Sequence, residues 1–366
     1  MSPDPSNAPP AAAPRGAPPL RLGDVEIGMP AVQAALSGYS DLPMRLCARE
    51  HGAPYALHEV VLDELVLQKG KLQRKILEVP EQDHPVGGQL MGSRPETFAA
   101  AARRLVDAGF DVVDINFGCP VNKVLGRCRG GYLLQHPDDA LALVDAVLQA
   151  VAGDAPVTVK MRRGYDDSAD SERAFFAILD GAFARGVAAI TVHPRTVVQK
   201  YQGPSRWEFL RRVKQHAGRR TILGSGDLFS PFDVVRMLQQ TGVDGVTVAR
   251  GCIGNPFVFG QVRDLLAGRA PLRPTAAQVG AALRRHWQLA VEHQGEKALS
   301  SVRTHAIKYA QYHPDPIAAR TRLVAVRRGG DLEAAIDEVF PQDAGADEAP
   351  RELRPDDAVV PAMSGA

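Results

Sequence analysis

The segment Val112-Val113-Asp114-Ile115-Asn116-Phe117-Gly118-Cys119-Pro120 decides the fold of this chain. Its apolar run, Val112–Phe117, predicts a buried strand, because buried parallel strands are short and rich in Val and Ile. The run stops at Gly118, and a cysteine that precedes a proline follows at once. The strand therefore ends in an amide, Asn116, and a thiol. Free cysteines are often buried as small apolar side chains, so the segment alone leaves Cys119 open between a packed and a reactive thiol.

Apolar runs of the same kind recur along the chain and alternate with stretches of helical spacing. Pro137–Val151, for example, begins with a proline and two acidic residues, which favour the start of a helix. The other helices predicted between the runs are Pro95–Gly109, Ser171–Gly186 and Pro231–Gly242. The eight predicted strands are Ala31–Leu36, Tyr55–Val60, Val86–Met91, Val112–Phe117, Val157–Met161, Ala188–His193, Thr221–Leu223 and Gly245–Ala249.

This alternation of eight strands with helices predicts a (β/α)8 barrel. A doubly wound sheet shares the alternation, but it usually has a glycine-rich dinucleotide turn after its first strand. No such turn follows Ala31–Leu36. After Asn255 no further strand is predicted, and the spacing indicates the helices Ala276–His293, Leu299–Tyr312, Ile317–Arg328 and Asp331–Val339. The expected fold class is α/β, a TIM barrel followed by a small all-helical C-terminal domain.

Four segments follow from these patterns. Residues 1–20 are rich in Pro and Ala and lack the apolar stretch of a signal peptide, so they predict a disordered leader. Residues 21–268 form the barrel, and residues 269–341 the helical domain. Residues 342–366 are acidic and poor in apolar side chains, which predicts a flexible tail.

Composition and charge indicate a soluble globular protein. The 366 residues carry a net charge of +1 and are long enough for one large and one small domain. The four cysteines include no CxxC pair, so we expect neither a zinc site nor a disulfide framework, and a reducing compartment fits best. No run of about 18 apolar residues occurs, so no membrane span is predicted. We expect a cytoplasmic monomer with no obligatory protein partner.

Polar side chains occupy the ends of successive predicted strands. In a (β/α)8 enzyme the active site lies at the carboxyl ends of the strands, so these side chains are expected to share one face. Lys160 is the hardest to assign to packing, because it interrupts an apolar run and buried lysines are rare unless paired. Gln89 and His193 each have a structural alternative, a hydrogen bond within the core. The strand-end residues are Gln89, Asn116, Cys119, Lys160, Arg162 and His193, followed by the turns Ser225-Gly226-Asp227 and Ala249-Arg250-Gly251.

The two glycine-bearing turns predict a phosphate site. In such barrels the loops after strands 7 and 8 commonly bind phosphate, and glycine lets backbone N–H groups approach the anion. Arg250 adds a positive charge. A phosphorylated cofactor is therefore indicated. A buried lysine and histidine beside an amide suit an isoalloxazine ring, which gains negative charge on reduction.

The ordered motifs of the chain resemble those of the tRNA-dihydrouridine synthases, over roughly residues 32–339. In the helical part, Arg303–Tyr309 is similar to the family's basic helix. The matching segments in the barrel are Ser40–Arg45, Gly88–Leu90, Asp114–Pro120 with Lys123-Val124, Gly130–Pro137, Val159–Arg162, Val192–Thr196, Tyr201–Trp207, and Arg250-Gly251 with Gly254-Asn255-Pro256. The family's Ala-Pro-Met-Ala-Gly after the first strand is replaced here by Ala34-Ala35-Leu36-Ser37-Gly38.

The resemblance implies a cofactor, a reaction and site residues. It implies FMN at the barrel mouth, reduced by NADPH or NADH, and hydride transfer to C6 of a tRNA uridine. Cys119 corresponds to the family's proton donor to C5. The residues that the resemblance assigns to FMN are Ala35, Leu36, Ser37, Gln89, Asn116, Lys160, His193, Ser225, Gly226, Asp227, Ala249 and Arg250; no metal is implied.

The charge distribution adds tRNA as the expected partner. Residues 261–330 contain 12 Lys and Arg but only 4 Asp and Glu, although a basic helical surface also occurs without a nucleic-acid partner. Under the resemblance, the cations that contact phosphates are drawn from Arg284, Arg285, Arg303, Lys308, Arg320, Arg322, Arg327 and Arg328. Two alternatives stay open: a flavin reductase for a free pyrimidine, and an RNA-binding protein without redox activity.

Overall fold

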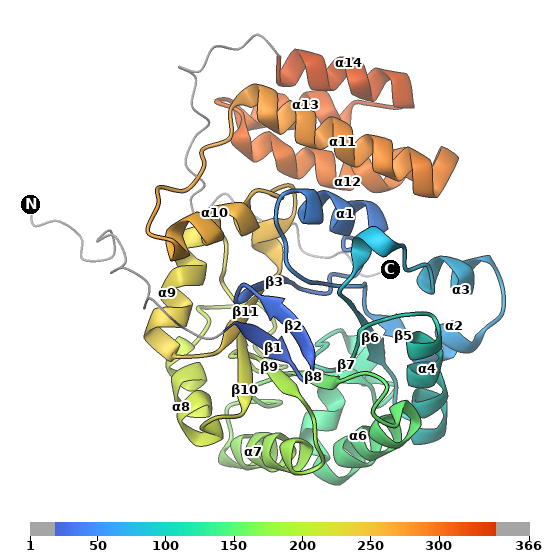
Figure 1. The fold of residues 1–366 in the computed structure, drawn as a ribbon, viewed down its shortest axis with the longest axis vertical. Helices are drawn as coiled ribbons and strands as arrows, with labels where there is room; N and C mark the ends of the chain where they lie inside the picture. The colour runs from blue at the N-terminus through green and yellow to red at the C-terminus, as the bar shows by residue number, and fades with distance from the viewer. Residues whose placement is uncertain (1–18, 342–366) are drawn as a thin grey trace, which may run out of the picture.

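A closed parallel barrel forms the larger part of the protein (Figure 1). The computed structural model describes residues 19–341. The ring closes because β4 pairs with both β3 and β6. Its strands are β3 (Ala31–Gln33), β4 (Ala56–Leu57), β6 (Val86–Met91), β7 (Val112–Phe117), β8 (Val157–Arg162), β9 (Ala189–His193), β10 (Thr221–Ser225) and β11 (Gly245–Val248). The predicted TIM barrel is confirmed.

The second predicted strand, Tyr55–Val60, differs from the structure. Two short pieces, β4 and β5 (Val61–Leu62), pair with different parts of β6, and the residues between them belong to neither strand. Between the two pieces, the carboxylate of Glu59 accepts a hydrogen bond from the backbone N–H of Gly38 at 2.5 Å, which links this segment to the loop after β3.

A β-hairpin that sequence reasoning missed covers the amino-terminal end of the barrel. β1 (Leu20–Leu22) and β2 (Val25–Gly28) pair antiparallel and cross in front of the barrel strands in Figure 1. Their apolar side chains join the barrel interior in one cluster with Val32, Leu57, Val112 and Leu223. The predicted leader falls outside the described residues except for Pro19 and Leu20, and Leu20 already belongs to β1 and is buried. The hairpin leaves the opposite end of the barrel open for chemistry.

Helices surround the barrel. The four that the sequence predicted appear as α4 (Pro95–Asp107), α6 (Pro137–Val151), α7 (Ala169–Ala184) and α9 (Pro231–Thr241). Ser230 and Asp233 form a capping box at the start of α9, which satisfies backbone N–H groups there. The remaining helices were not predicted: α1 (Leu42–Glu50), α2 (Asp63–Leu67), α3 (Lys71–Ile76), α5 (Asn122–Leu125), α8 (Trp207–Ala217) and α10 (Val258–Leu266).

The C-terminal helices pack around a core of their own, as expected. They are α11 (Ala276–Gln294), α12 (Ala298–Tyr309), α13 (Pro316–Val324) and α14 (Gly329–Val339). α13 ends four residues earlier than predicted, where Arg327 donates to the carbonyl of Val324. α11 meets the barrel through α1, where Leu42, Leu46, Cys47 and Leu289 form a separate apolar cluster. The predicted tail, residues 342–366, lies outside the described residues.

The domain boundary between residues 268 and 269, which separates the barrel from the helical part, stays a prediction. α10 ends at Leu266 and α11 begins after Thr275, so the predicted boundary falls within the connecting segment. Among residues 19–341, every helix is too short or too polar to span a bilayer.

Candidate active site at the barrel mouth

The period of two along each strand selects which side chains face the barrel interior. Asp114 and Asn116 share the inner face of β7, and Lys160 and Arg162 share that of β8. The parallel register places Asn116 beside Lys160, and Arg162 beside His193. The alternate residues point outward into the apolar layer between strands and helices: Val113, Ile115, Phe117, Val159 and Met161. The predicted strand-end residues therefore converge on the interior near the carboxyl ends.

A chain of hydrogen bonds fixes the amides of Gln89 and Asn116. Asn116 donates from Nδ2 to Gln89 Oε1 at 2.7 Å, and Gln89 donates from Nε2 to Asp114 at 2.6 Å. Thr158 donates to the other oxygen of Asp114 at 2.5 Å, and the N–H of Gly118 donates to Asn116. Burial raises the pKa of the Asp114 carboxyl, although the hydrogen bonds oppose this. Sequence reasoning had not included Asp114 among the site residues, yet it orients Gln89.

Lys160 is a half-buried cation without a hydrogen-bond or ion-pair partner in the described residues. Burial, aided by the charge of Arg162, lowers the pKa of Lys160 to about 8, while Asp114 and Cys119 act in the opposite direction. A cation in a low-dielectric site without an anion is costly. The position of Lys160 therefore favours a ligand that carries negative charge.

Cys119 lies in the loop after β7, and the glycines that follow hold that loop in place. Gly130 has φ +58°, and a Cβ there would lie 2.9 Å from Cys119 Cβ. The N–H of Gly131 donates to the carbonyl of Cys119 at 3.1 Å. Burial raises the pKa of the Cys119 thiol, against the opposing effects of Val121, Lys160 and Arg162. The group is therefore a protonated thiol at neutral pH.

His193 is a neutral imidazole with no hydrogen-bond partner in the described residues. Burial lowers its pKa well below the usual value, and the charges of Arg162 and Lys160 lower it further. Its ring packs against Gly226, where a Cβ would come within 2.9 Å of Nε2. The close contact requires glycine at this position. The imidazole is free to bond a ligand at the mouth.

The turn after β10 presents unpaired backbone groups. Gly226 and Asp227 have φ values of +104° and +54°, and neither backbone N–H makes a hydrogen bond with the described residues. The Asp227 carboxylate accepts from Arg195 at 2.6 Å, from the N–H of Ser205 at 2.8 Å and from Arg250 at 3.1 Å. Its side chain thus anchors two arginines, so any contact of Asp227 with a phosphate runs through its backbone.

The other predicted cofactor residues lie on the same rim. Ser225 is the last residue of β10 and is buried, and Ala249 directly precedes Arg250 at the end of β11. Ala35, Leu36 and Ser37 follow β3. Ser40 fixes this loop, because its hydroxyl accepts from the N–H of Leu36 at 2.8 Å.

An aromatic side chain at the mouth was not predicted as a site residue. Tyr201 is 55% exposed, and the guanidinium groups of Arg162 and Arg250 each lie 5.4 Å from its ring centre. Arg162 also donates to the carbonyls of Gly118 and Thr196, which joins the loops after β7 and β9. An exposed aromatic ring is suited to stacking on a planar ligand. The sequence contained Tyr201 in a matched motif but gave it no role.

Comparison with known proteins identifies relatives over nearly the whole described chain. The sequence model of one family, dihydrouridine synthase (Dus), matches residues 32–343. A probable tRNA-dihydrouridine synthase 1 of Synechocystis sp. is 33% identical over 318 residues, which cover 86% of this chain and 88% of that protein. A probable tRNA-dihydrouridine synthase of Mycobacterium tuberculosis is 33% identical over 331 residues, 87% and 84% of the two chains.

Solved structures give a second comparison, of the fold alone. Morphinone reductase in complex with tetrahydroNAD superimposes with a TM-score of 0.52 at 14% sequence identity, over 72% of this chain and 93% of that one. The likeness supports the barrel assignment.

Proposed function

This chain belongs to the dihydrouridine synthase family, and on that premise we propose that it reduces specific uridines of tRNA to 5,6-dihydrouridine, with FMN as cofactor and NADPH or NADH as reductant. The observation that carries the proposal is the placement of a protonated thiol, Cys119, beside the unpartnered ammonium of Lys160 at the ends of neighbouring strands. We further propose that the protein is a cytoplasmic monomer. Light scattering measures its oligomeric state directly.

The residues at the barrel mouth fit FMN. The unpartnered ammonium of Lys160 matches the edge of an isoalloxazine ring that gains negative charge on reduction. Gln89 presents an amide of fixed orientation to the same ring. The free N–H groups of Gly226 and Asp227, with Arg250 nearby, suit the phosphate. Ala35, Leu36, Ser37, Asn116, His193, Ser225 and Ala249 complete the proposed FMN contacts.

The chain's own contribution to the reaction is a proton. When bound and reduced, FMN supplies a hydride to C6 of the uracil ring. Cys119 donates its proton to C5, so that one hydrogen adds to each end of the former double bond and a thiolate remains. Lys160 and Arg162 stabilise this thiolate, because their positive charges lower the pKa of Cys119, whereas burial raises it. Water then restores the thiol.

The target base must leave its stack before it reaches Cys119. Tyr201 offers an exposed ring at the mouth between Arg162 and Arg250. Stacking of a base on an aromatic ring stabilises an extruded nucleotide by about 1–3 kcal/mol. We assign Tyr201 to this contact.

The cations proposed for tRNA phosphates fall into two groups. Arg284, Arg285, Arg322 and Arg328 form ion pairs with Asp337, Glu50, Glu338 and Asp331. Within the described residues, Arg303, Lys308, Arg320 and Arg327 have no acidic partner. Burial lowers the pKa of Lys308, and the neighbouring Arg320 lowers it further, so two like charges lie close together. We propose that the unpaired four bind phosphates.

Loss of the Lys308 and Arg320 charges is expected to weaken tRNA binding. The double variant Lys308→Ala/Arg320→Ala removes two phosphate contacts, so the slope of log affinity against log salt should fall by about 2. Filter binding or fluorescence anisotropy at several salt concentrations measures the slope. Arg173→Ala, which removes an exposed cation of α7, is the control and should leave the slope unchanged.

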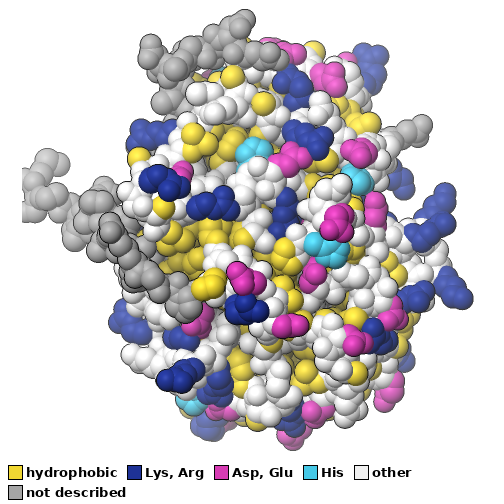
Figure 2. Space-filling model, in the orientation of Figure 1, with side chains coloured by type: hydrophobic (Ala, Val, Ile, Leu, Met, Phe, Trp, Pro, Cys, Tyr) yellow, Lys and Arg dark blue, Asp and Glu magenta, His cyan; other side chains and the backbone are white. Residues whose placement is uncertain are grey.

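Figure 2 shows the face of the molecule on which the hairpin of β1 and β2 lies. On this face, Lys and Arg side chains are scattered among Asp and Glu rather than gathered in one patch. An unchanged salt slope in the double variant would contradict the assignment.

The pH dependence of uridine reduction is expected to report Cys119. Only the thiol form donates a proton, and burial raises its pKa above the usual value of about 8.5. The rate of uridine reduction should therefore be at its maximum at neutral pH and should fall as the pH rises through the raised pKa of Cys119. Single-turnover reduction of tRNA, measured between about pH 6.5 and 10.5, gives the profile. A fall in rate centred near pH 8 would match the pKa of Lys160 instead and would contradict the expectation.

The function itself is tested by a spectrum and an assay. The purified protein is expected to show flavin absorbance and to form dihydrouridine in tRNA isolated from a strain that lacks the activity. A colourless protein that still binds tRNA would favour the RNA-binding alternative. Rapid NADPH-dependent turnover of free uracil or uridine without RNA would favour the small-molecule reductase.

A further inference from the structure

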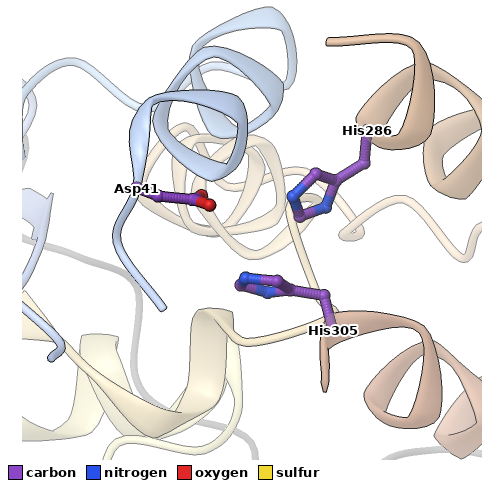
Figure 3. A group of neighbouring side chains, drawn as sticks. All are labelled: Asp41, His286 and His305. Atoms are coloured by element: carbon purple, nitrogen blue, oxygen red, sulfur yellow. The ribbon is translucent and has the colours of Figure 1, made fainter. Parts of the chain in front are cut away.

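Three ligand-type side chains meet away from the barrel mouth, where α1 contacts the helical region. Asp41 precedes α1, His286 lies on α11 and His305 lies on α12. Figure 3 shows the carboxylate and the two imidazoles pointing toward one another from these three elements. One oxygen and one nitrogen from each ring all lie within 4.8 Å of one another. The proposed function assigns no role to this cluster.

The two histidines are buried, and their ring nitrogens lack well-formed hydrogen bonds. His286 is 2% exposed and His305 is 1% exposed, and none of the four ring nitrogens has a hydrogen bond of normal geometry, although Tyr39 packs against the His305 ring. The rings lie 4.6 Å apart between centres, at 53° to each other. Buried polar atoms are rarely left unpaired, because each loses its bond to water without replacement. Two neighbouring imidazoles of this kind indicate that a ligand belongs between them.

Asp41 is oriented as a metal-binding carboxylate would be. Its Oδ2 accepts from Gln294 at 2.6 Å and from Ser301 at 2.7 Å, and its Oδ1 accepts from the N–H of Met44 at 3.2 Å. A carboxylate has about four acceptor positions, so one is still free. Hydrogen bonds of this kind hold ligating carboxylates in position in known metal sites.

The ligand types also suit a cation. An unprotonated imidazole offers a lone pair to a metal ion, and a carboxylate offers negative charge. The centre contains one carboxylate and two imidazoles.

A cavity borders the centre on the side of Asp41. A cavity of about 160 Å³ lies between α1, α3 and the end of α11, away from the proposed FMN site, and Asp41 and Gln294 line it. Further polar side chains on its wall are Arg45, His58, Glu59, Lys75, Glu78 and His293. Among the three proposed ligands, Asp41 is the one that lines this cavity.

We propose that Asp41, His286 and His305 bind a divalent first-row transition-metal ion of the zinc type. Two imidazoles and one carboxylate form a common ligand set for such ions, with a water molecule in the remaining position. With bonds of about 2.0–2.2 Å at tetrahedral angles, ligand atoms lie about 3.3–3.6 Å apart. The three ligand atoms lie within 4.8 Å of one another, so the side chains need to approach by up to about 1.5 Å when the ion binds.

The ion would join the barrel to the helical region. α12 carries both His305 and the unpaired cations Arg303 and Lys308, while Asp41 follows the loop after β3. Binding at Asp41 and His305 therefore fixes the position of α12 relative to the barrel mouth. This goes beyond the proposed function and does not depend on it.

Metal binding by the full chain tests the proposal. After removal of any affinity tag and treatment with chelator, the protein is titrated with Zn²⁺ and, separately, with Co²⁺. We expect one equivalent of each to bind, with Co²⁺ showing visible bands of nitrogen and oxygen ligation, and the thermal midpoint to rise. His286→Asn and His305→Asn should each weaken binding by about 100-fold or more.

The controls separate the centre from other metal ligands. His216→Asn replaces an exposed histidine paired with Asp180 and should bind like the parent chain. If either histidine variant does not fold, Asp41→Asn keeps the shape of that side chain and should also lose affinity. The proposal is overturned if the parent chain binds neither ion below about 100 μM. It is equally overturned if binding persists in both histidine variants, or if Co²⁺ shows thiolate charge-transfer bands. The metal titration measures neither flavin content nor uridine reduction, so a negative result would not contradict the proposed function.

Discussion

Replacement of Cys119 by alanine is expected to slow dihydrouridine formation by about 10²–10⁴-fold, the usual contribution of a general acid. The variant should bind FMN and accept electrons from NADPH as before, because the proposed flavin contacts come from other side chains. The loop should persist as well, since the bond from Gly131 goes to the backbone carbonyl of Cys119. Dihydrouridine content of tRNA in single-turnover reactions, measured beside the rate of flavin reduction, separates the two half-reactions.

Cys128→Ala is the matched control. This exposed cysteine lies in the same loop, and its removal should leave both half-reactions unchanged. Cys119→Ser tests the chemistry more closely, because a hydroxyl of similar size is a much weaker acid than a thiol. Full activity in Cys119→Ala would refute the role of Cys119 as proton donor.

The largest effect on stability is expected from Asp83→Ala. Asp83 and Arg45 form an ion pair that is almost entirely removed from solvent, with exposures of 0% and 1%. Arg45 donates to Oδ2 of Asp83 through Nε at 2.8 Å and through Nη2 at 2.5 Å. Removal of the carboxylate leaves a buried guanidinium without its anion, which should lower the free energy of unfolding by about 3–5 kcal/mol. Urea unfolding followed by circular dichroism measures the change.

Two further variants test the cause. Arg173→Ala removes an ion pair whose partners are 71% and 83% exposed, and its cost should stay below about 1 kcal/mol. The double variant Arg45→Met/Asp83→Leu removes both charges and should recover much of the lost stability, because a buried pair barely offsets its own desolvation. If Asp83→Ala were as stable as the parent chain, the pair would not anchor α1.

The barrel could be predicted because its determinants are local. A run such as Val157–Met161 has the length and the β-branched residues of a buried strand, whatever lies beside it. The same reasoning failed where local spacing was weak or the pairing was split, as in Tyr55–Val60 and the hairpin of β1 and β2. α8 shows a missed pattern: Phe209, Leu210, Val213 and Ala217 are its buried face, and their spacing in the sequence fits a helix.

The gathering of the candidate residues at one end of the barrel could be predicted, but the hydrogen bonds between them could not. The period of two places Asn116, Lys160 and His193 on the inner face once the strands are known. The orientation of Gln89 by Asp114, and the use of the Asp227 side chain by Arg195 and Arg250, depend on distances between separate strands and loops.

The sequence by itself determined the barrel class, most of its strands, some of the helices around it, the alternation that turns polar residues inward, and the family. Only the tertiary structure decided which charges are paired and which polar groups are buried. His305 lies in a segment that resembles a basic tRNA-binding helix, yet packing against α1 and α11 removes it from solvent and places it beside Asp41 and His286. The physical reason is that burial and ion pairing arise from contacts between segments far apart in the chain, whereas strands and helices follow from neighbouring residues.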